Sequence, residues 1–272
     1  MELKQQSDYE QYIRQDSLGE YYVVLNQYTF YSVYQPIFDK HRNIIGMEAL
    51  LRIRGVDGTN IRPDLFFADA SINTYFRLCI EFLSRAIHIR NFAKHFAGST
   101  IKLFLNVMPQ TLLTLTKDMG FKDNGLLYKR LEELGMHPSD VVFEVVEESC
   151  GDTELLIEAV QLMRTNGFLF AIDDFGSHHS NMSRVKHLCP DIIKIDRSYL
   201  LDYCSGDTLA IANAVELAEE MNAKVVIEGV EENIQLSAMQ RLDLDYYQGF
   251  YLGKPNAIHH WTNQVNSNKL LH

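Results

Sequence analysis

TELLIEAVQLMRTNGFLFAIDDFG, residues 153–176, has the pattern of a helix and a strand joined by a glycine. Apolar residues recur at helical spacing as far as Asn166, and Gly167 stands where a helix C-cap is expected. The run FLFAI (168–172) is apolar at every position, which is typical of a strand buried on both faces of a parallel sheet. The stretch therefore predicts a helix that leads through a tight turn into a buried strand.

The same alternation extends in both directions along the chain. Further strand-like runs are VYQPIF (33–38), IKLFLNV (101–107), VVFEVV (141–146), DIIKI (191–195) and AKVVIE (223–228). Helical patterns cover 64–96, which is long enough for two helices, and 124–134, 208–222 and 233–242. Strands that alternate with helices indicate a parallel sheet covered by helices. In a chain of 272 residues with six such units, we expect an α/β fold of the (β/α)8 barrel type.

Composition excludes several classes of protein. The net charge of -11 argues against proteins that bind nucleic acid polymers or membrane surfaces electrostatically. No apolar stretch approaches the roughly 20 residues of a membrane span, and the polar opening MELKQQSDYEQ is unlike a signal peptide. The four cysteines (79, 150, 189 and 204) have no C-x-x-C spacing, which is consistent with a reducing compartment. We therefore expect a cytoplasmic protein.

No composition shift divides the chain into separate domains. Residues 1–30 are polar and then aromatic, and we interpret them as a leader packed on the main domain, which we place at residues 31–257. Residues 258–272 are interpreted as a C-terminal tail.

Polar side chains stand within or directly after most of the predicted strands. They are Glu48, Asn106, Glu144, Asp173, Asp174, Lys194, Asp196 and Glu228. Because the carboxyl ends of parallel barrel strands meet at one mouth, we expect these side chains to converge. Carboxylate and amide oxygens suit Mg²⁺ or Mn²⁺, and the set lacks the Cys/His spacing of a structural zinc site.

Asp173 and Asp174 are adjacent, which sets a geometric condition. Successive side chains of a strand point to opposite faces, so both aspartates serve one centre only if the strand ends between them. Phe175-Gly176 supplies a bend at that point. One aspartate is then able to bridge two cations, as in two-metal phosphoester hydrolysis.

Each of these residues also has an ordinary structural explanation. A single strand glutamate is commonly salt-bridged, Asn106 alone would be a turn former, and Lys194 alone would be a solvated lysine or part of a structural ion pair. Two aspartates before a glycine also occur in simple turns. Their shared position at strand ends is what favours a site.

Seven segments, taken in order, resemble the EAL-domain cyclic di-GMP phosphodiesterases from about Tyr31 to Pro255. They are Glu48-Ala49-Leu50, Asn106 in LFLNVMPQTL, Glu144 and Glu147 in FEVVEES, Asp173 to Gly176, Lys194-Ile195-Asp196, Glu228 to Glu231, and Gln248-Gly249. The resemblance implies a modified (β/α)8 barrel whose first strand is antiparallel. It also implies hydrolysis of cyclic di-GMP to linear pGpG with two Mg²⁺ or Mn²⁺ ions, in a homodimer.

The resemblance also assigns roles by position. Glu48, Asn106, Glu144 and Asp173 match ligands of the first metal, and Asp173 and Asp174 match ligands of the second. Glu228 and Lys194 match the groups that orient and deprotonate the attacking water, and Glu147 matches the anchor of the loop after the aspartates. Gln35, Leu50 and Arg52 match substrate contacts, and Gln248 matches an outer contributor. Glu231 and Asp196 belong to the matched segments without a separate role.

The chain departs from the family pattern in the loop after the aspartates. The loop reads DFGSHHSNM, with His178 in place of a glycine and Asn181 in place of a serine. Ile53 stands where the family usually has an aromatic residue. Two alternatives to an active phosphodiesterase remain. One is a catalytically silent EAL module that binds cyclic di-GMP or a protein partner, and the other is a metal-dependent barrel enzyme with a different substrate.

Overall fold

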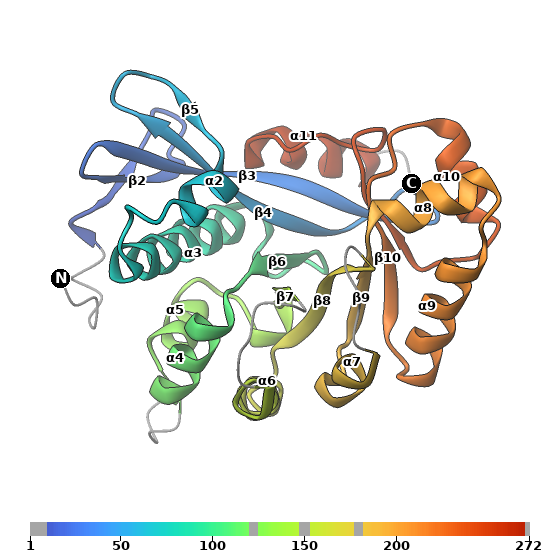
Figure 1. Ribbon diagram of the computed structural model, residues 1–272. Coiled ribbons are helices and arrows are strands. Elements are labelled where there is room, and N and C mark those ends of the chain that lie inside the picture. Colours follow the sequence, from blue (N-terminus) through green and yellow to red (C-terminus); the bar gives the residue numbers. More distant parts are fainter. Residues whose placement is uncertain (1–9, 120–124, 147–152, 177–181, 270–272) are drawn as a thin grey trace.

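The computed structural model describes residues 10–119, 125–146, 153–176 and 182–269 (Figure 1). Eight strands of this part close a barrel. They are β3 (Tyr28–Asp39), β4 (Ile44–Gly55), β6 (Lys102–Asn106), β7 (Val141–Val146), β8 (Leu169–Phe175), β9 (Ile192–Ile195), β10 (Lys224–Ile227) and β11 (Tyr246–Tyr247). β3 pairs antiparallel with both β11 and β4, and the other neighbours pair in parallel. The modified (β/α)8 barrel with an antiparallel first barrel strand is confirmed.

The six strands predicted from periodicity are all present. Periodicity did not identify β4, in which polar and apolar residues mix, or β11, which is only two residues long. Both strands are needed to close the ring. β4 lies between β3 and β6, and β11 lies between β10 and β3.

Helices cover the outside of the barrel (Figure 1). They are α2 (Pro63–Ala68), α3 (Thr74–Phe96), α4 (Pro109–Met119), α5 (Leu126–Glu133), α6 (Thr153–Thr165), α7 (Met182–Leu188), α8 (Arg197–Ser205), α9 (Leu209–Glu220), α10 (Asn233–Gln240) and α11 (Ile258–Lys269), with a 3₁₀ turn, η1 (Pro138–Asp140). The 64–96 pattern does hold two helices. Gly167 has φ +90°, the left-handed conformation that lets the chain turn from α6 into β8. Within the described residues, no helix has both the length and the hydropathy needed to cross a bilayer.

The sheet continues beyond the barrel on one side. β1 (Ile13–Gln15) and β2 (Tyr21–Leu25) extend it from β3, and β5 (Asn60–Ile61) extends it from β4 (Figure 1). This extension shares a separate apolar core with α2 and α3, which includes Val23, Phe30, Ile53 and Leu83. Part of the segment interpreted as a leader therefore consists of sheet strands.

The segment interpreted as a C-terminal tail contains the helix α11. Ile258 and Trp261 are buried, and the Trp261 indole donates a hydrogen bond to the Tyr34 carbonyl at 2.8 Å. Ile258, Trp261 and Val265 have the i, i+3, i+7 spacing of a helix face, but the other residues of the segment are polar, and the sequence analysis did not use this spacing.

A layer of apolar side chains closes the interior of the barrel. It consists of Ile37, Phe104, Val142, Ala171, Ile192 and Val226, which are almost completely buried and form one cluster. Gly46 belongs to the same level, because a Cβ there would lie 2.4 Å from the Phe104 ring. Since side chains alternate along a strand, the residue two positions further toward the barrel mouth faces inward again.

Candidate active site

The inward-facing layer above the apolar one is polar on every barrel strand. Two positions beyond the apolar layer, or at the matching position of β11, stand Gln35, Glu48, Asn106, Glu144, Asp173, Lys194, Glu228 and Gln248. Glu228 and Gln248 directly follow β10 and β11. The Glu228 amide donates to the Ile195 carbonyl at 3.0 Å and the Gln248 amide donates to the Ile227 carbonyl at 2.9 Å, so the parallel hydrogen-bond pattern continues to these residues. The convergence expected from the sequence is therefore present for these residues.

Lys194 lies at the centre of this layer with only 1% of its side chain exposed. Its ammonium nitrogen is 2.6 Å from Glu144 Oε1, 2.7 Å from Asp173 Oδ1, 2.9 Å from Glu228 Oε1 and 3.7 Å from Glu48 Oε2. Burial alone would lower the pKa of Lys194, but the surrounding carboxylates outweigh it and hold that pKa well above its ordinary value. Lys194 is thus a charged ammonium that neutralises part of an acidic cluster.

Glu144 is the most deeply placed carboxylate of the cluster. Its side chain is 0% exposed, and burial raises its pKa well above the ordinary value despite the opposing charge of Lys194. Within the described residues, Glu144 Oε2 has no hydrogen-bond partner. A buried carboxylate oxygen without a partner is costly, so this atom needs a proton or a cation.

Two carboxylates nearer to the mouth also have raised pKa values. Burial, opposed by Lys194, raises the pKa of Glu228 to about 8. Asp174 is more exposed, but partial burial of its carboxyl, together with the charge of Asp173, raises its pKa to about 6. One ammonium is therefore insufficient to keep the whole set ionised near neutral pH, and added positive charge is favoured here.

Asp173 and Asp174 do face one centre, but not in the way expected. We predicted that the strand ends between them, and this is wrong, because β8 continues to Phe175. Instead, Asp174 has φ +53° and the β8–β9 register shifts between Ile172 and Phe175. Because of this irregularity, the adjacent side chains of Asp173 and Asp174 do not point to opposite faces of the sheet. One oxygen each of Asp173, Asp174 and Glu228 lie within 4.8 Å of one another.

Glu48 stands in the middle of β4 rather than at its end, because β4 runs on to Gly55 outside the barrel. Its Oε1 accepts a hydrogen bond from Asn106 Nδ2 at 3.2 Å, and its Oε2 accepts one from Gln248 Nε2 at 2.7 Å. The side-chain amides of Asn106 and Gln248 therefore contact the carboxylate cluster.

The donor set fits a hard divalent cation. Glu48, Asn106, Glu144, Asp173 and Asp174 offer only oxygen ligands, which Mg²⁺ and Mn²⁺ prefer. The unpartnered oxygen of Glu144 and the crowded pair of aspartates show where positive charge is needed.

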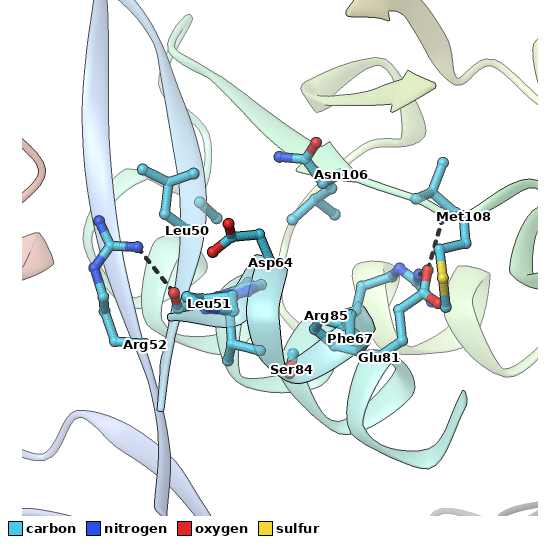
Figure 2. A pocket seen from close by; sticks show the side chains of 15 residues that line it. Leu50, Leu51, Arg52, Asp64, Phe67, Glu81, Ser84, Arg85, Asn106 and Met108 are labelled. Carbon is cyan, nitrogen blue, oxygen red and sulfur yellow. Dashed lines mark hydrogen bonds and ion pairs between the residues drawn. The ribbon is translucent and has the colours of Figure 1, made fainter. Parts of the chain in front are cut away.

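Two hollows adjoin the polar layer. One of about 430 Å³ is lined by residues that include Leu50, Arg52, Asp64 and Asn106 (Figure 2). Burial lowers the pKa of Arg52 from its ordinary value, and its guanidinium donates to the Leu51 carbonyl at 2.9 Å. The other hollow, about 160 Å³, is lined by Gln35, Glu48, Glu228, Glu231, Gln248 and Phe250 among others.

Two of the matched residues are engaged in local structure. Glu231 forms a double ion pair with Arg197 at 2.8 and 2.6 Å. Asp196 caps α8 by accepting from the Ser198 amide at 3.0 Å. Glu147, His178 and Asn181 lie outside the described residues.

Sequence reasoning missed several residues that line the larger hollow, among them Asp64, Glu81, Ser84 and Arg85. Asp64 follows Pro63 at the start of α2, and Glu81 and Arg85 have the i, i+4 spacing of a helical ion pair. That spacing is usual on exposed helix faces, so it did not reveal that this pair is buried beside Asn106.

The EAL domain model matches residues 20–255 of the chain. The "Probable cyclic di-GMP phosphodiesterase PdeA" of Escherichia coli is 29% identical over 229 residues, which are 82% of this chain and 30% of the relative. The "Uncharacterized EAL-domain containing protein YkuI" of Bacillus subtilis is 31% identical over 82% of this chain and 54% of the relative. The chain thus spans about a third to a half of the length of these relatives.

Solved structures show the same architecture. The YkuI structure, in complex with substrate c-di-GMP and calcium, matches with a TM-score of 0.72 and 26% identity over 89% of this chain and 63% of that one. A manganese/cyclic di-GMP complex of Klebsiella pneumoniae BlrP1 matches with a TM-score of 0.71 and 27% identity over 83% of this chain and 55% of that one.

Proposed function

The chain belongs to the EAL domain family, and from this premise we propose that it hydrolyses cyclic di-GMP to linear pGpG with two divalent cations, Mg²⁺ or Mn²⁺. The observation that carries the proposal is the ring of oxygen donors around Lys194 at the mouth of the barrel. Similar proteins solved with cyclic di-GMP together with calcium or manganese support it.

Five residues are assigned to the cations. Glu48, Asn106, Glu144 and Asp173 would hold the first, and Asp173 and Asp174 the second. When bound, the two cations neutralise the charge of the phosphodiester and acidify the water that attacks it. Asp174 reaches this position only through the irregularity in β8.

Glu228 and Lys194 are assigned to the attacking water. Glu228 lies 2.9 Å from Lys194 at the mouth of the barrel, and in the metal-free protein burial raises its pKa to about 8, which favours proton exchange by this carboxyl. The Lys194 ammonium orients this carboxylate and donates hydrogen bonds that hold the water.

The two hollows are assigned to the substrate. The planar guanidinium of Arg52 is suited to pair with a phosphate oxygen, and Leu50 offers an apolar surface to a guanine ring. Gln35 donates to the Gly253 carbonyl at 3.2 Å, which fixes its side chain on the other side of the cluster beside Gln248.

Purified protein is expected to convert cyclic di-GMP to pGpG with Mg²⁺ or Mn²⁺ and to lose this activity in excess chelator. Chromatography of the nucleotide products measures the conversion with each metal and with chelator in parallel. Tight binding of cyclic di-GMP without turnover under all metal conditions would instead identify a receptor. Turnover of another phosphodiester, with cyclic di-GMP untouched, would identify a different enzyme of the same fold.

We further propose that the protein acts in the cytoplasm as a homodimer, by analogy with the family. Light scattering across a range of concentrations is expected to give twice the chain mass of 31.4 kDa. A fully active monomer at every concentration would contradict the dimer.

A further inference from the structure

Glu81 of α3 reaches across to the junction between β6 and α4. Its Oε1 accepts a hydrogen bond from the Met108 amide at 2.9 Å, and its Oε2 accepts one from the Thr111 hydroxyl at 2.5 Å. Met108 directly precedes the first residue of α4, Pro109. Figure 2 shows Glu81 and Arg85 near Met108, and Asn106 lines the same hollow.

The chain around Asn106 is held at the two residues that follow it. The Val107 amide donates to the Glu144 carbonyl at 3.0 Å, which ties it to β7. The Met108 amide has Glu81 as its acceptor. Asn106 itself is exposed at the end of β6, and its amide contacts Glu48 at 3.2 Å. Where the carboxamide points therefore depends on how these two anchors hold the backbone.

Helix α4 depends on an acceptor from another element. Met108, the residue before Pro109, has no side-chain oxygen for the free amides of the first turn. A carboxylate at a helix N-terminus also interacts favourably with the helix dipole. Glu81 instead accepts from the amide of Met108 and from the Thr111 hydroxyl and adds a negative charge at this end, so the start of α4 is tied to α3.

The carboxylate of Glu81 is nearly buried and is balanced by Arg85. Their side chains are 11% and 5% exposed, and Arg85 Nη2 lies 3.1 Å from Glu81 Oε1. A buried ion pair is a weak source of stability because both charges lose their hydration. Its more distinctive effect is geometric, since a carboxylate with three donors is held in one orientation.

We propose that Glu81 is a positioning residue of the metal site, which fixes the β6–α4 junction so that Asn106 faces the cation beside Glu48. The inference rests on the metal binding in the proposed function, but it does not require turnover of cyclic di-GMP. Groups that orient a metal ligand from outside typically change metal affinity by 10–100-fold when they are altered.

The test is calorimetric titration of metal-free protein with Mn²⁺ in the absence of nucleotide. Glu81→Gln keeps the shape of the side chain but loses the charge that pairs with Arg85, and its single oxygen cannot replace the two that accept from the Met108 amide and the Thr111 hydroxyl. We expect Mn²⁺ affinity to fall by about 10-fold. In an Asn106→Ala background, the same substitution is expected to change the affinity less than 2-fold, because the residue being positioned is absent.

Arg90→Met is the matched control for general loosening of α3. Arg90 lies on the same helix, is 7% exposed and pairs with Glu10 far from the junction. We expect this variant to lose thermal stability with Mn²⁺ affinity unchanged. If Glu81→Gln does not fold, Glu81→Asp replaces it. This variant keeps the charge but shortens the side chain by one methylene, and we expect the same loss of Mn²⁺ affinity.

An unchanged Mn²⁺ affinity in the Glu81 variant, or an equal loss with and without Asn106, would overturn the proposal and leave Glu81 as a helix cap only. If wild-type protein binds Mn²⁺ but does not hydrolyse cyclic di-GMP, the proposed reaction fails while this titration still decides the role of Glu81. The proposal is supported if the Glu81 substitution lowers Mn²⁺ affinity when Asn106 is present and does not lower it in the Asn106→Ala background.

Discussion

Asp173→Asn is expected to lower the rate of cyclic di-GMP hydrolysis at least about 1,000-fold, equivalent to about 4 kcal/mol of activation free energy, while the barrel stays folded. Asp173 is the residue assigned to both cations, and its oxygens lie within 4.8 Å of oxygens of Asp174 and Glu228. Asparagine offers one neutral oxygen and cannot replace a shared carboxylate. Glu48→Ala is expected to have the same consequence, because it removes another carboxylate assigned to the first cation.

The fold should survive Asp173→Asn because the substitution relieves crowding among carboxylates. Lys194 keeps its close contacts with Glu144 and Glu228. The measurement is the single-turnover rate with saturating Mn²⁺, with circular dichroism and thermal unfolding on the same samples. Glu219→Gln, which neutralises an exposed carboxylate on α9, is the matched control and should leave the rate unchanged. A near-wild-type rate in Asp173→Asn or Glu48→Ala would show that the metal assignment is wrong.

Lys194→Met is expected to have opposite effects on metal binding and on turnover. In the metal-free protein the Lys194 ammonium neutralises part of the buried cluster, so its removal takes away the positive charge 2.6 Å from Glu144. Breaking a buried ion pair by removing one partner costs about 3–5 kcal/mol. Proton uptake by the carboxylates offsets part of that cost, because burial has already raised the pKa values of Glu144 and Glu228.

Added metal should reverse the loss in Lys194→Met. Because the ammonium no longer competes for the same oxygens, we expect Mn²⁺ to bind the variant about 10-fold more tightly and to raise its melting temperature more than it raises that of the wild type. Turnover should nevertheless be lost, because Lys194 is assigned to orienting the water. The measurements are melting temperature with chelator and with saturating Mn²⁺, calorimetric titration with Mn²⁺, and nucleotide turnover.

Lys224→Met is the control for the loss of a lysine. Lys224 pairs with Asp245 at 2.7 Å on the surface, with 59% of its side chain exposed. Such a pair contributes at most about 1 kcal/mol, so neither stability nor Mn²⁺ affinity should change greatly. Weaker Mn²⁺ binding by Lys194→Met than by the wild type would contradict the idea that this lysine occupies the place of a cation.

The residue pattern was sufficient for the strands that are buried on both faces. VVFEVV and FLFAI are apolar at nearly every position because helices cover the sheet on one side and the barrel interior lies on the other. β11 has only two residues, and β4 passes from the barrel into the extension with its separate apolar core, so neither strand has one environment along its length that would give a regular pattern.

The sequence by itself identified the polar residues that the structure brings together inside the barrel. An apolar inward residue is followed two positions later by a polar one, as in Phe104 and Asn106, or Ala171 and Asp173. A spacing of two is a property of one strand, and it can be recognised without knowledge of the strand's neighbours. The oxygen chemistry of the set is likewise readable from residue types alone.

Only the tertiary structure decided how these residues meet. Closure of the ring puts Lys194 between carboxylates from four other strands, and the positive φ of Asp174 turns its side chain toward them. Closure also puts Glu81 against a junction whose amide lies 27 positions away in the chain. Such contacts depend on strand register, ring closure and helix placement, because these are properties of several segments together and no single segment encodes them.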